Sequence, residues 1–322
     1  MYFITSGGLT SVSYGGQTSA VVACMPAGGY NKEMEKKFLI FLIGFLFILN
    51  IYAWQEVFVL ASEDSLLKVY FLDVGQGDSQ LIVTPENHQI LVDGGQTSAV
   101  LEKLQKLMPF SDRTIDLVIL THPERDHMQG LIGVLQRYKV KNILWTGVLR
   151  DTSEYQQWIS VLAEEQKQGA EIATAQSGQT ITAGSILITI LNPYENLAGQ
   201  ELKDSNDSSV VFRLSFNEMD FLFTGDISTS TEKDIIERNN NLQSEVLKVA
   251  HHGSKYSTSE EFLENIQAEI AVVSVGKNSY GHPTPETLQK LEKFGIHILR
   301  TDLNGDISII SDGNNLKLIT NN

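Results

Sequence analysis

Histidines in this sequence gather at a few points, each beside acidic residues or glycine. Five of the seven histidines follow a predicted strand or lie in a glycine-bounded turn: His122, His127, His251, His252 and His282. Neutral imidazoles and ionised carboxylates are ligands for divalent metal ions. The single cysteine, Cys24, cannot form an internal disulfide or a cysteine-based zinc site. We therefore expect any metal here to use histidine and carboxylate ligands.

The first cluster, residues 121–127 (Thr-His-Pro-Glu-Arg-Asp-His), comes directly after an apolar run. His122, Glu124 and Asp126 alternate by two positions, so in an extended loop their side chains would point the same way. Two other segments follow predicted strands in the same manner: Thr224-Gly225-Asp226 and His251-His252-Gly253-Ser254. The sequence thus offers at least seven potential nitrogen and oxygen ligands at strand ends, enough for two metal ions.

Each of these features has a structural alternative when it is taken alone. His88 and His297 are best explained as solvated side chains, and a Thr-Gly-Asp sequence is often only a turn. The His-His-Gly sequence is compatible with a helix cap. The metal-site interpretation is favoured because all of these segments end apolar strands within one chain.

Short strands that alternate with helices would position these side chains. We expect strands over 67–74, 80–83, 89–92, 115–120, 142–145, 185–191, 210–216, 221–224, 246–250, 270–274, 297–300, 306–311 and 316–319. We expect helices over 99–107, 130–137, 153–168, 230–238, 258–266 and 285–294. Two halves, each with strands followed by helices, predict an α/β layered sandwich. The polar stretch 192–208 is long for a loop in a compact domain, which favours a functional role.

The composition is that of a globular protein. The 322 residues are 42% hydrophobic and 20% charged, which excludes disorder, collagen or a coiled coil as a description of the whole chain. The formal net charge of −15 argues against a protein that holds nucleic acid by a basic surface alone.

The N-terminal region differs in composition from the rest. Residues 1–37 are expected to be disordered, and the apolar run 38–54 predicts a transmembrane anchor or a signal peptide over 38–61. Residues 62–66 would form a linker and residues 67–322 the folded domain. Lysines before the run and acidic residues after it predict a cytoplasmic N-terminus and an extracytoplasmic domain, membrane-anchored or secreted. Met34 is a plausible true start, which would make residues 1–33 an upstream artefact.

Several segments together resemble the metallo-β-lactamase superfamily. They are Leu91-Val92-Asp93-Gly94-Gly95, residues 121–127 and Thr224-Gly225-Asp226. Three others resemble the extracytoplasmic hydrolase domain of ComEC-like competence proteins: residues 71–79, residues 247–254 and Ser279-Tyr280-Gly281-His282-Pro283. The resemblance covers about Leu67 to Ser311. It implies a four-layer αββα sandwich, here without the channel region of those proteins.

The resemblance also implies roles for individual residues. The ligands of the metal site would be His122, Glu124, Asp126, His127, Asp226, His251 and His282. Catalysis would involve Asp126, Asp226 and His252. Three further residues would contact the ligands and orient them: Asp93, Asn206 and Asp78. The substrate would contact Lys255 and Ser254. The simpler interpretation of Lys248 and Lys255 is a solvated lysine, although either would add positive charge near the site.

Two departures from the superfamily pattern make the site richer in oxygen. Glu124 stands where the common pattern has histidine, and Asn206 falls where most members have another histidine. One or two divalent ions are expected, with Mn²⁺ or Mg²⁺ favoured over Zn²⁺ by ligand hardness. A metal-bound water, its pKa lowered from 15.7 towards about 7, would then attack a phosphodiester such as single-stranded DNA.

Two other classes of function remain open from the sequence. The first cluster also resembles that of flavodiiron oxidoreductases, although no flavin-binding domain follows residue 320 in this sequence. A non-catalytic module tethered to the cytoplasmic membrane is the third interpretation. The sequence predicts neither the oligomeric state nor the natural substrate.

Overall fold

The computed structural model describes residues 32–63, 66–239 and 241–320. The chain divides into two compact units, Met1–Val57 and Phe58–Asn322. The folded domain predicted from residue 67 therefore falls within the second unit.

One long helix, α1 (Lys32–Glu63), accounts for the described N-terminal residues. Its apolar side chains between Phe38 and Leu49 are exposed. Within the described ranges, however, no helix combines the length and the apolar character that crossing a membrane requires. The predicted transmembrane anchor is therefore not supported. Of the segment predicted to be disordered, residues 32–37 are helical and residues 1–31 lie outside the described residues.

The first sheet has eight strands in the order β15-β14-β1-β2-β3-β4-β5-β6. Its bounds are β1 (Leu67–Phe71), β2 (Gln80–Val83), β3 (Gln89–Val92), β4 (Thr114–Ile119), β5 (Lys139–Trp145), β6 (Glu171–Thr174), β14 (Ile307–Ser311) and β15 (Leu316–Thr320). Strands β3 to β6 run parallel, whereas β1 is antiparallel to both β2 and β14. Parallel pairing brings the carboxyl ends of β3 and β4 to the same edge of the sheet.

The second sheet has seven strands in the order β13-β12-β11-β10-β9-β8-β7. Its bounds are β7 (Thr180–Ala183), β8 (Ile186–Asn192), β9 (Val211–Phe216), β10 (Met219–Phe223), β11 (Val246–Lys248), β12 (Ile270–Val273) and β13 (His297–Arg300). Strands β10 to β13 are parallel, so the loops after β10 and β11 also leave from one edge.

An apolar core fills the space between the two sheets. Phe212 stacks on Phe223 with ring centroids 4.6 Å apart, and Phe71 lies 6.1 Å from Phe223 on the other side. Full burial of each such side chain stabilises the fold by about 1.5–3 kcal/mol. This core joins strands of both sheets into one sandwich.

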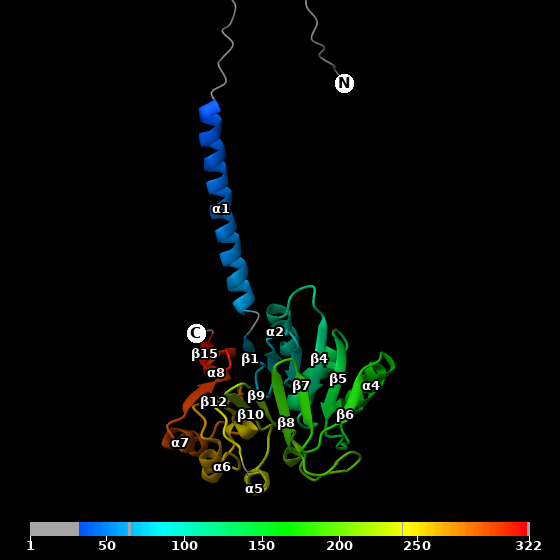
Figure 1. Ribbon diagram of the computed structural model, residues 1–322. Coiled ribbons are helices and arrows are strands. Elements are labelled where there is room, and N and C mark those ends of the chain that lie inside the picture. Colours follow the sequence, from blue (N-terminus) through cyan, green and yellow to red (C-terminus); the bar gives the residue numbers. More distant parts are fainter. Residues whose placement is uncertain (1–31, 64–65, 240, 321–322) are drawn as a thin grey trace, which may run out of the picture. The chain divides into compact units, whose positions relative to one another are not determined.

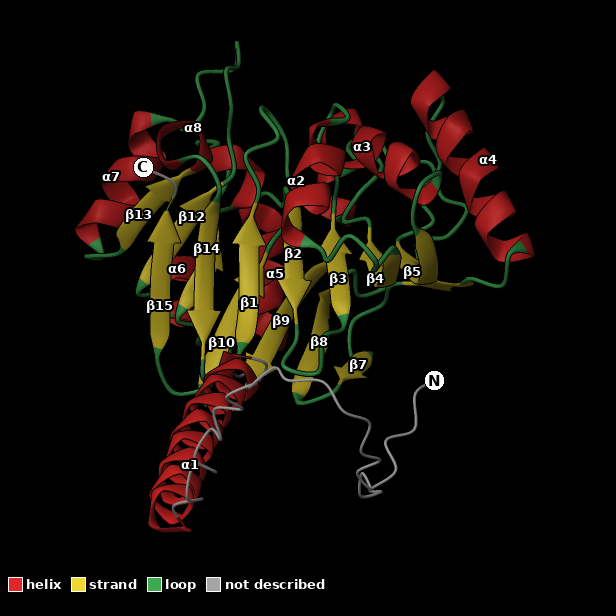
Figure 2. Ribbon diagram, turned by 90° about the horizontal axis from the view of Figure 1, so that it is seen from above, coloured by secondary structure: helices red, strands yellow, loops and turns green. Residues whose placement is uncertain are grey.

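Helices cover the outer face of each sheet (Figures 1 and 2). The first sheet packs against α2 (Ala99–Leu107), α3 (Arg125–Leu135) and α4 (Ser153–Lys167). The second packs against α5 (Thr229–Arg238), α6 (Glu260–Ile266) and α7 (Pro285–Lys293). A short α8 (Thr301–Asn304) follows β13. The predicted four-layer αββα sandwich is confirmed.

Candidate metal centre

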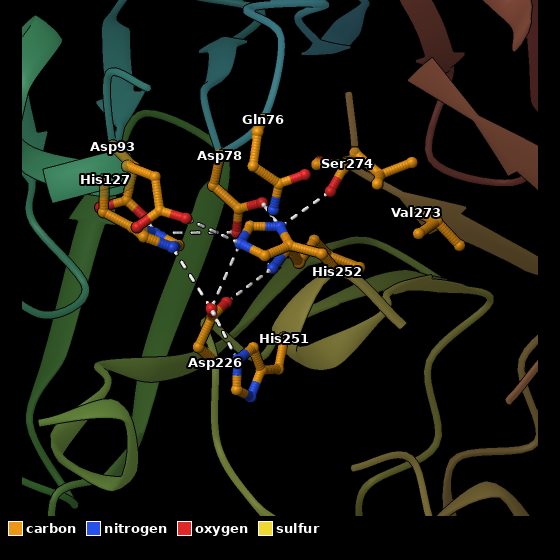
Figure 3. Close-up of polar contacts among 12 residues, drawn as sticks. Gln76, Asp78, Asp93, His127, Asp226, His251, His252, Val273 and Ser274 are labelled. Atoms are coloured by element: carbon orange, nitrogen blue, oxygen red, sulfur yellow. Dashed lines mark hydrogen bonds and ion pairs between the residues drawn. The ribbon is translucent and has the colours of Figure 1, made fainter. Parts of the chain in front are cut away.

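The side chains predicted to bind metal or to take part in catalysis leave the carboxyl ends of strands in both sheets. His122 follows β4 of the first sheet, whereas Asp226 and His252 follow β10 and β11 of the second. The sandwich brings these strand ends together, and Figure 3 shows Asp226 between His127, His252 and His251.

Helix α3 begins inside the first histidine cluster. Glu124 is its N-cap, with extended backbone angles of φ −93° and ψ 154°, and Asp126 and His127 lie in the first turn. The prediction of an extended loop in which alternate residues align is therefore wrong, as is the predicted helix start at residue 130. Gly130 lets the helix approach the loop after β3, because a Cβ there would lie 1.9 Å from the Gly94 carbonyl oxygen.

Asp93 fixes the orientation of His127. Its Oδ2 accepts a hydrogen bond from His127 Nδ1 at 2.7 Å and another from Thr121 Oγ1 at 2.7 Å. Its Oδ1 accepts from the Thr121 backbone N–H at 2.8 Å. Because Nδ1 carries the proton in this arrangement, the lone pair of His127 Nε2 is free to bind a metal. Asp93 thus lies where the sequence predicted a supporting carboxylate.

Asp226 is the meeting point of three imidazoles. Its Oδ2 lies 3.4 Å from His127 Nε2, 3.3 Å from His252 Nε2 and 4.0 Å from His251 Nε2. Asp126 Oδ2 approaches the same His252 Nε2 at 3.3 Å. A carboxylate in this position is suited to bridging two ions.

His252 is oriented by the neighbouring strand. Its Nδ1 donates a hydrogen bond to the Ser274 carbonyl oxygen at 2.8 Å, which again leaves Nε2 free. His251 and His252 both adopt left-handed backbone conformations, with φ of 50° and 51°. Non-glycine residues in this region are uncommon and concentrate at functional sites.

The donor atoms fit a divalent cation. Among the residues described, ligand atoms lie within 4.8 Å of one another in three groups: His122, His127 and Asp226; Asp126, His127 and His252; Asp78, Asp93 and His127. Among the described residues, the buried Nε2 atoms of His122, His127 and His252 have no hydrogen-bond partner. Buried polar atoms are rarely left without a partner, and a divalent ion would provide one for these nitrogens.

The buried charges shift the pKa values of the ligands in opposite directions. Burial and the charge on His127 lower the pKa of His122 to about 3, which keeps its imidazole neutral. Burial also disfavours charge on His127 and His252, but the Asp226 carboxylate and its acidic neighbours raise both pKa values well above the usual range. Burial would raise the pKa of Asp226, but the cations around it lower that pKa well below its usual value. Without metal, protons on two imidazoles therefore balance the carboxylates.

Lys248 is buried in this centre. Its side chain is 1% exposed and its ammonium forms a short ion pair with Asp78. The interpretation of Lys248 as a solvated lysine is therefore wrong. The sequence held a signal for this, because the lysine stands in the apolar run Val246-Leu247-Lys248-Val249-Ala250.

Three of the predicted ligands, Glu124, His251 and His282, lie outside the three ligand groups. Glu124 Oε1 pairs with Arg150 Nη2 at 2.6 Å and also accepts a short hydrogen bond from Ser205. The His282 ring lies 5.5 Å from the His251 ring. Arg150 was not predicted, because it lies between β5 and α4 and belongs to none of the motifs.

The remaining predicted residues have mainly local contacts. Asn206 Nδ2 lies 3.5 Å from His251 Nε2, consistent with support for that imidazole. The exposed Lys255 ammonium lies 5.0 Å from the ring centroid of Tyr256. Ser254 is buried and its hydroxyl accepts a hydrogen bond from the Tyr256 backbone N–H. Neither contact supports the predicted substrate role.

The fold and the site together are those of metallo-β-lactamase-fold hydrolases, a class that implies divalent metal. Residues 88–259 match the beta-lactamase superfamily domain, and the chain belongs to that family. The crystal structure of the metallo-beta-lactamase fold protein YhfI from Bacillus subtilis has the same fold, with a TM-score of 0.51. The two chains are 15% identical over 77% of this chain and 100% of the other.

Within the superfamily, the chain is similar to competence proteins. ComE operon protein 3 of Bacillus subtilis (strain 168) is 31% identical over 259 residues, which are 74% of this chain and 32% of that protein. Competence protein ComA of Neisseria gonorrhoeae is 30% identical over 237 residues, 72% of this chain and 30% of that protein. The chain thus spans about a third of the length of these relatives.

Proposed function

We propose that the protein is a metal-dependent phosphodiesterase that cleaves DNA or a related phosphodiester outside the cytoplasmic membrane. The observation that carries the proposal is the position of Asp226, whose Oδ2 lies close to the free Nε2 atoms of both His127 and His252. Asp226 belongs to one ligand group and lies beside His252 of another, an arrangement that suits a pair of ions. The names of the competence-protein relatives favour a nucleic acid as the substrate.

The chain's own residues would hold and orient the reacting groups. His122, His127 and Asp226 would bind one ion, and Asp126 and His252 would bind the second, with Asp226 shared. When bound, divalent ions activate water as a nucleophile and neutralise charge on phosphate oxygens. Asp126, about a third exposed, is the ligand at the solvent side and is placed to orient that water.

The ions would also supply most of the attraction for an anionic substrate. The chain carries a formal charge of −15, and the buried Lys248 is already paired with Asp78. We therefore expect DNA binding to depend on the metal. Tight DNA binding in excess EDTA would contradict this expectation.

The test is hydrolysis of bis-p-nitrophenyl phosphate and single-stranded DNA by the purified chain, with Mn²⁺, Zn²⁺ or Mg²⁺ added to metal-stripped protein. Activity should return with at least one metal and should be lost in His122→Ala. His88→Ala, which changes a histidine remote from the ligand groups, is the matched control and should retain activity. Full activity of His122→Ala, or none in the wild type with any metal, would refute the proposal.

A further inference from the structure

The Lys248 ammonium has three partners, and two of them are carboxylates. It pairs with Asp78 Oδ2, donates to the Gly225 carbonyl oxygen at 3.0 Å and lies 3.6 Å from Asp226 Oδ1. The contact with Asp226 Oδ1 is an ion pair rather than a hydrogen bond, because that oxygen has no hydrogen-bond partner within the described part of the chain. With a side chain 1% exposed, Lys248 is not available to a substrate.

The two oxygens of Asp226 consequently have different surroundings. Oδ1 faces Lys248, whereas Oδ2 faces the imidazoles of His127 and His252. The Gly225 carbonyl adds a second attachment of the lysine to the same loop. The position of this loop relative to β11 is fixed by parallel pairing of β10 with β11, in which Phe223 lies opposite Lys248.

We propose that Lys248 is a positioning residue that keeps Asp226 Oδ1 away from the ions, so that Oδ2 alone bridges both of them. The inference rests on the metal centre proposed above, although not on the identity of the substrate. A carboxylate without this restraint can bind one ion with both oxygens and no longer bridge. Loss of Lys248 should then weaken binding of the second ion while binding of the first is retained.

A simpler role for Lys248 would be to balance the buried charge of Asp78. The double variant Lys248→Met/Asp78→Asn is therefore compared with the single variant Asp78→Asn, because both lack the Asp78 charge and they differ only at Lys248. If Lys248 only balances charge, the double variant should bind both ions at least as tightly as Asp78→Asn does. If Lys248 positions Asp226, the double variant should bind the second ion at least about tenfold more weakly than Asp78→Asn does, the usual effect of losing a residue that orients a metal ligand.

The experiment is Mn²⁺ titration of the full chain by calorimetry, combined with electron paramagnetic resonance of the loaded protein. The wild type should show two binding events and a signal from two exchange-coupled ions, and the double variant should lose the coupled signal. Lys290→Met is the matched control, because Lys290 is partly buried and donates to the Ser257 carbonyl oxygen at 2.8 Å outside the ligand groups. It should retain both binding events.

The outcomes distinguish failure of this inference from failure of the proposed function. Two unaltered binding events and an unaltered coupled signal in the double variant would overturn the role of Lys248 only. Absence of Mn²⁺ binding in the wild type would overturn the metal centre itself. If the variants do not fold, crystals of the Mn²⁺-loaded wild type decide: Asp226 Oδ1 should stay beside Lys248, and both Asp226 oxygens bound to ions would overturn the proposal.

Discussion

Replacement of Asp93 by asparagine should weaken metal binding without unfolding the protein. Asp93 Oδ1 accepts the Thr121 backbone N–H at 2.8 Å, and Oδ2 accepts His127 Nδ1–H at 2.7 Å. An asparagine can keep the first bond through its carbonyl oxygen, but its NH₂ group then faces His127 Nδ1. His127 must in turn accept at Nδ1 and carry its proton on Nε2, the atom that faces Asp226.

The expected loss of metal affinity in Asp93→Asn follows from this change in the tautomer of His127. Loss of a support behind a metal ligand costs about 10–100-fold in affinity, or about 1.4–2.8 kcal/mol. The hydrogen bond from the Thr121 backbone N–H is retained, and asparagine has the same shape as aspartate. The free energy of unfolding without metal should therefore fall by no more than about 1–3 kcal/mol, the cost of one unsatisfied buried group.

The assay is competitive titration of Mn²⁺ and Zn²⁺ against a chromophoric chelator, beside urea denaturation in EDTA. Asp116→Asn is the matched control, because Asp116 also accepts a backbone N–H, from Gln89 at 2.9 Å, but lies outside the ligand groups. Its metal affinity should be that of the wild type. Unchanged affinity in Asp93→Asn would refute the assignment of His127 Nε2 as a ligand.

Three further predictions concern the helix contact, Glu124 and pH. Gly130→Ala places a Cβ 1.9 Å from the Gly94 carbonyl oxygen and should lower the free energy of unfolding in urea by about 1–3 kcal/mol or more. In the control Gly133→Ala the new Cβ has no contact nearer than 3.4 Å, so this variant should be as stable as the wild type or more stable by up to about 1 kcal/mol. Equal stability of the two variants would contradict this. Glu124→Gln should change Mn²⁺ affinity by less than about tenfold, since that carboxylate bonds to other side chains; a larger loss would show that it binds metal. The raised pKa of His127 means that a proton must leave this imidazole when metal binds. Metal affinity should therefore rise with pH through the neutral range, and calorimetry in two buffers would measure the proton release. An affinity independent of pH would argue against this imidazole as a ligand.

Residues at strand ends are easier to place from the sequence than the contacts made by the loops around them. His122, Asp226 and His252 were identifiable because each follows an apolar strand, and parallel strands end at a common edge of a sheet. The relation between Glu124 and Arg150 was not predictable, because it depends on a loop packed across the site.

Edge strands and the start of α3 were also missed. The strands β6 and β7 have only four residues each, which is too short for a clear hydrophobic pattern, and none of these residues is fully buried. Helix α3 begins five residues before its predicted start at residue 130, because Pro123 and the extended Glu124 initiate it within a run of polar residues. That start, rather than an extended loop, turns His127 towards Asp93.

The central claim is that Asp226 joins two ligand groups into one metal centre. The most direct measurement is the content of Mn²⁺ or Zn²⁺ per chain after equilibrium dialysis, determined by mass spectrometry for the wild type and for Asp226→Ala. We expect the wild type to retain about two ions and the variant to retain fewer than about one, because the shared bridging ligand is lost. Equal metal content in the two proteins, or none in the wild type, would contradict the claim.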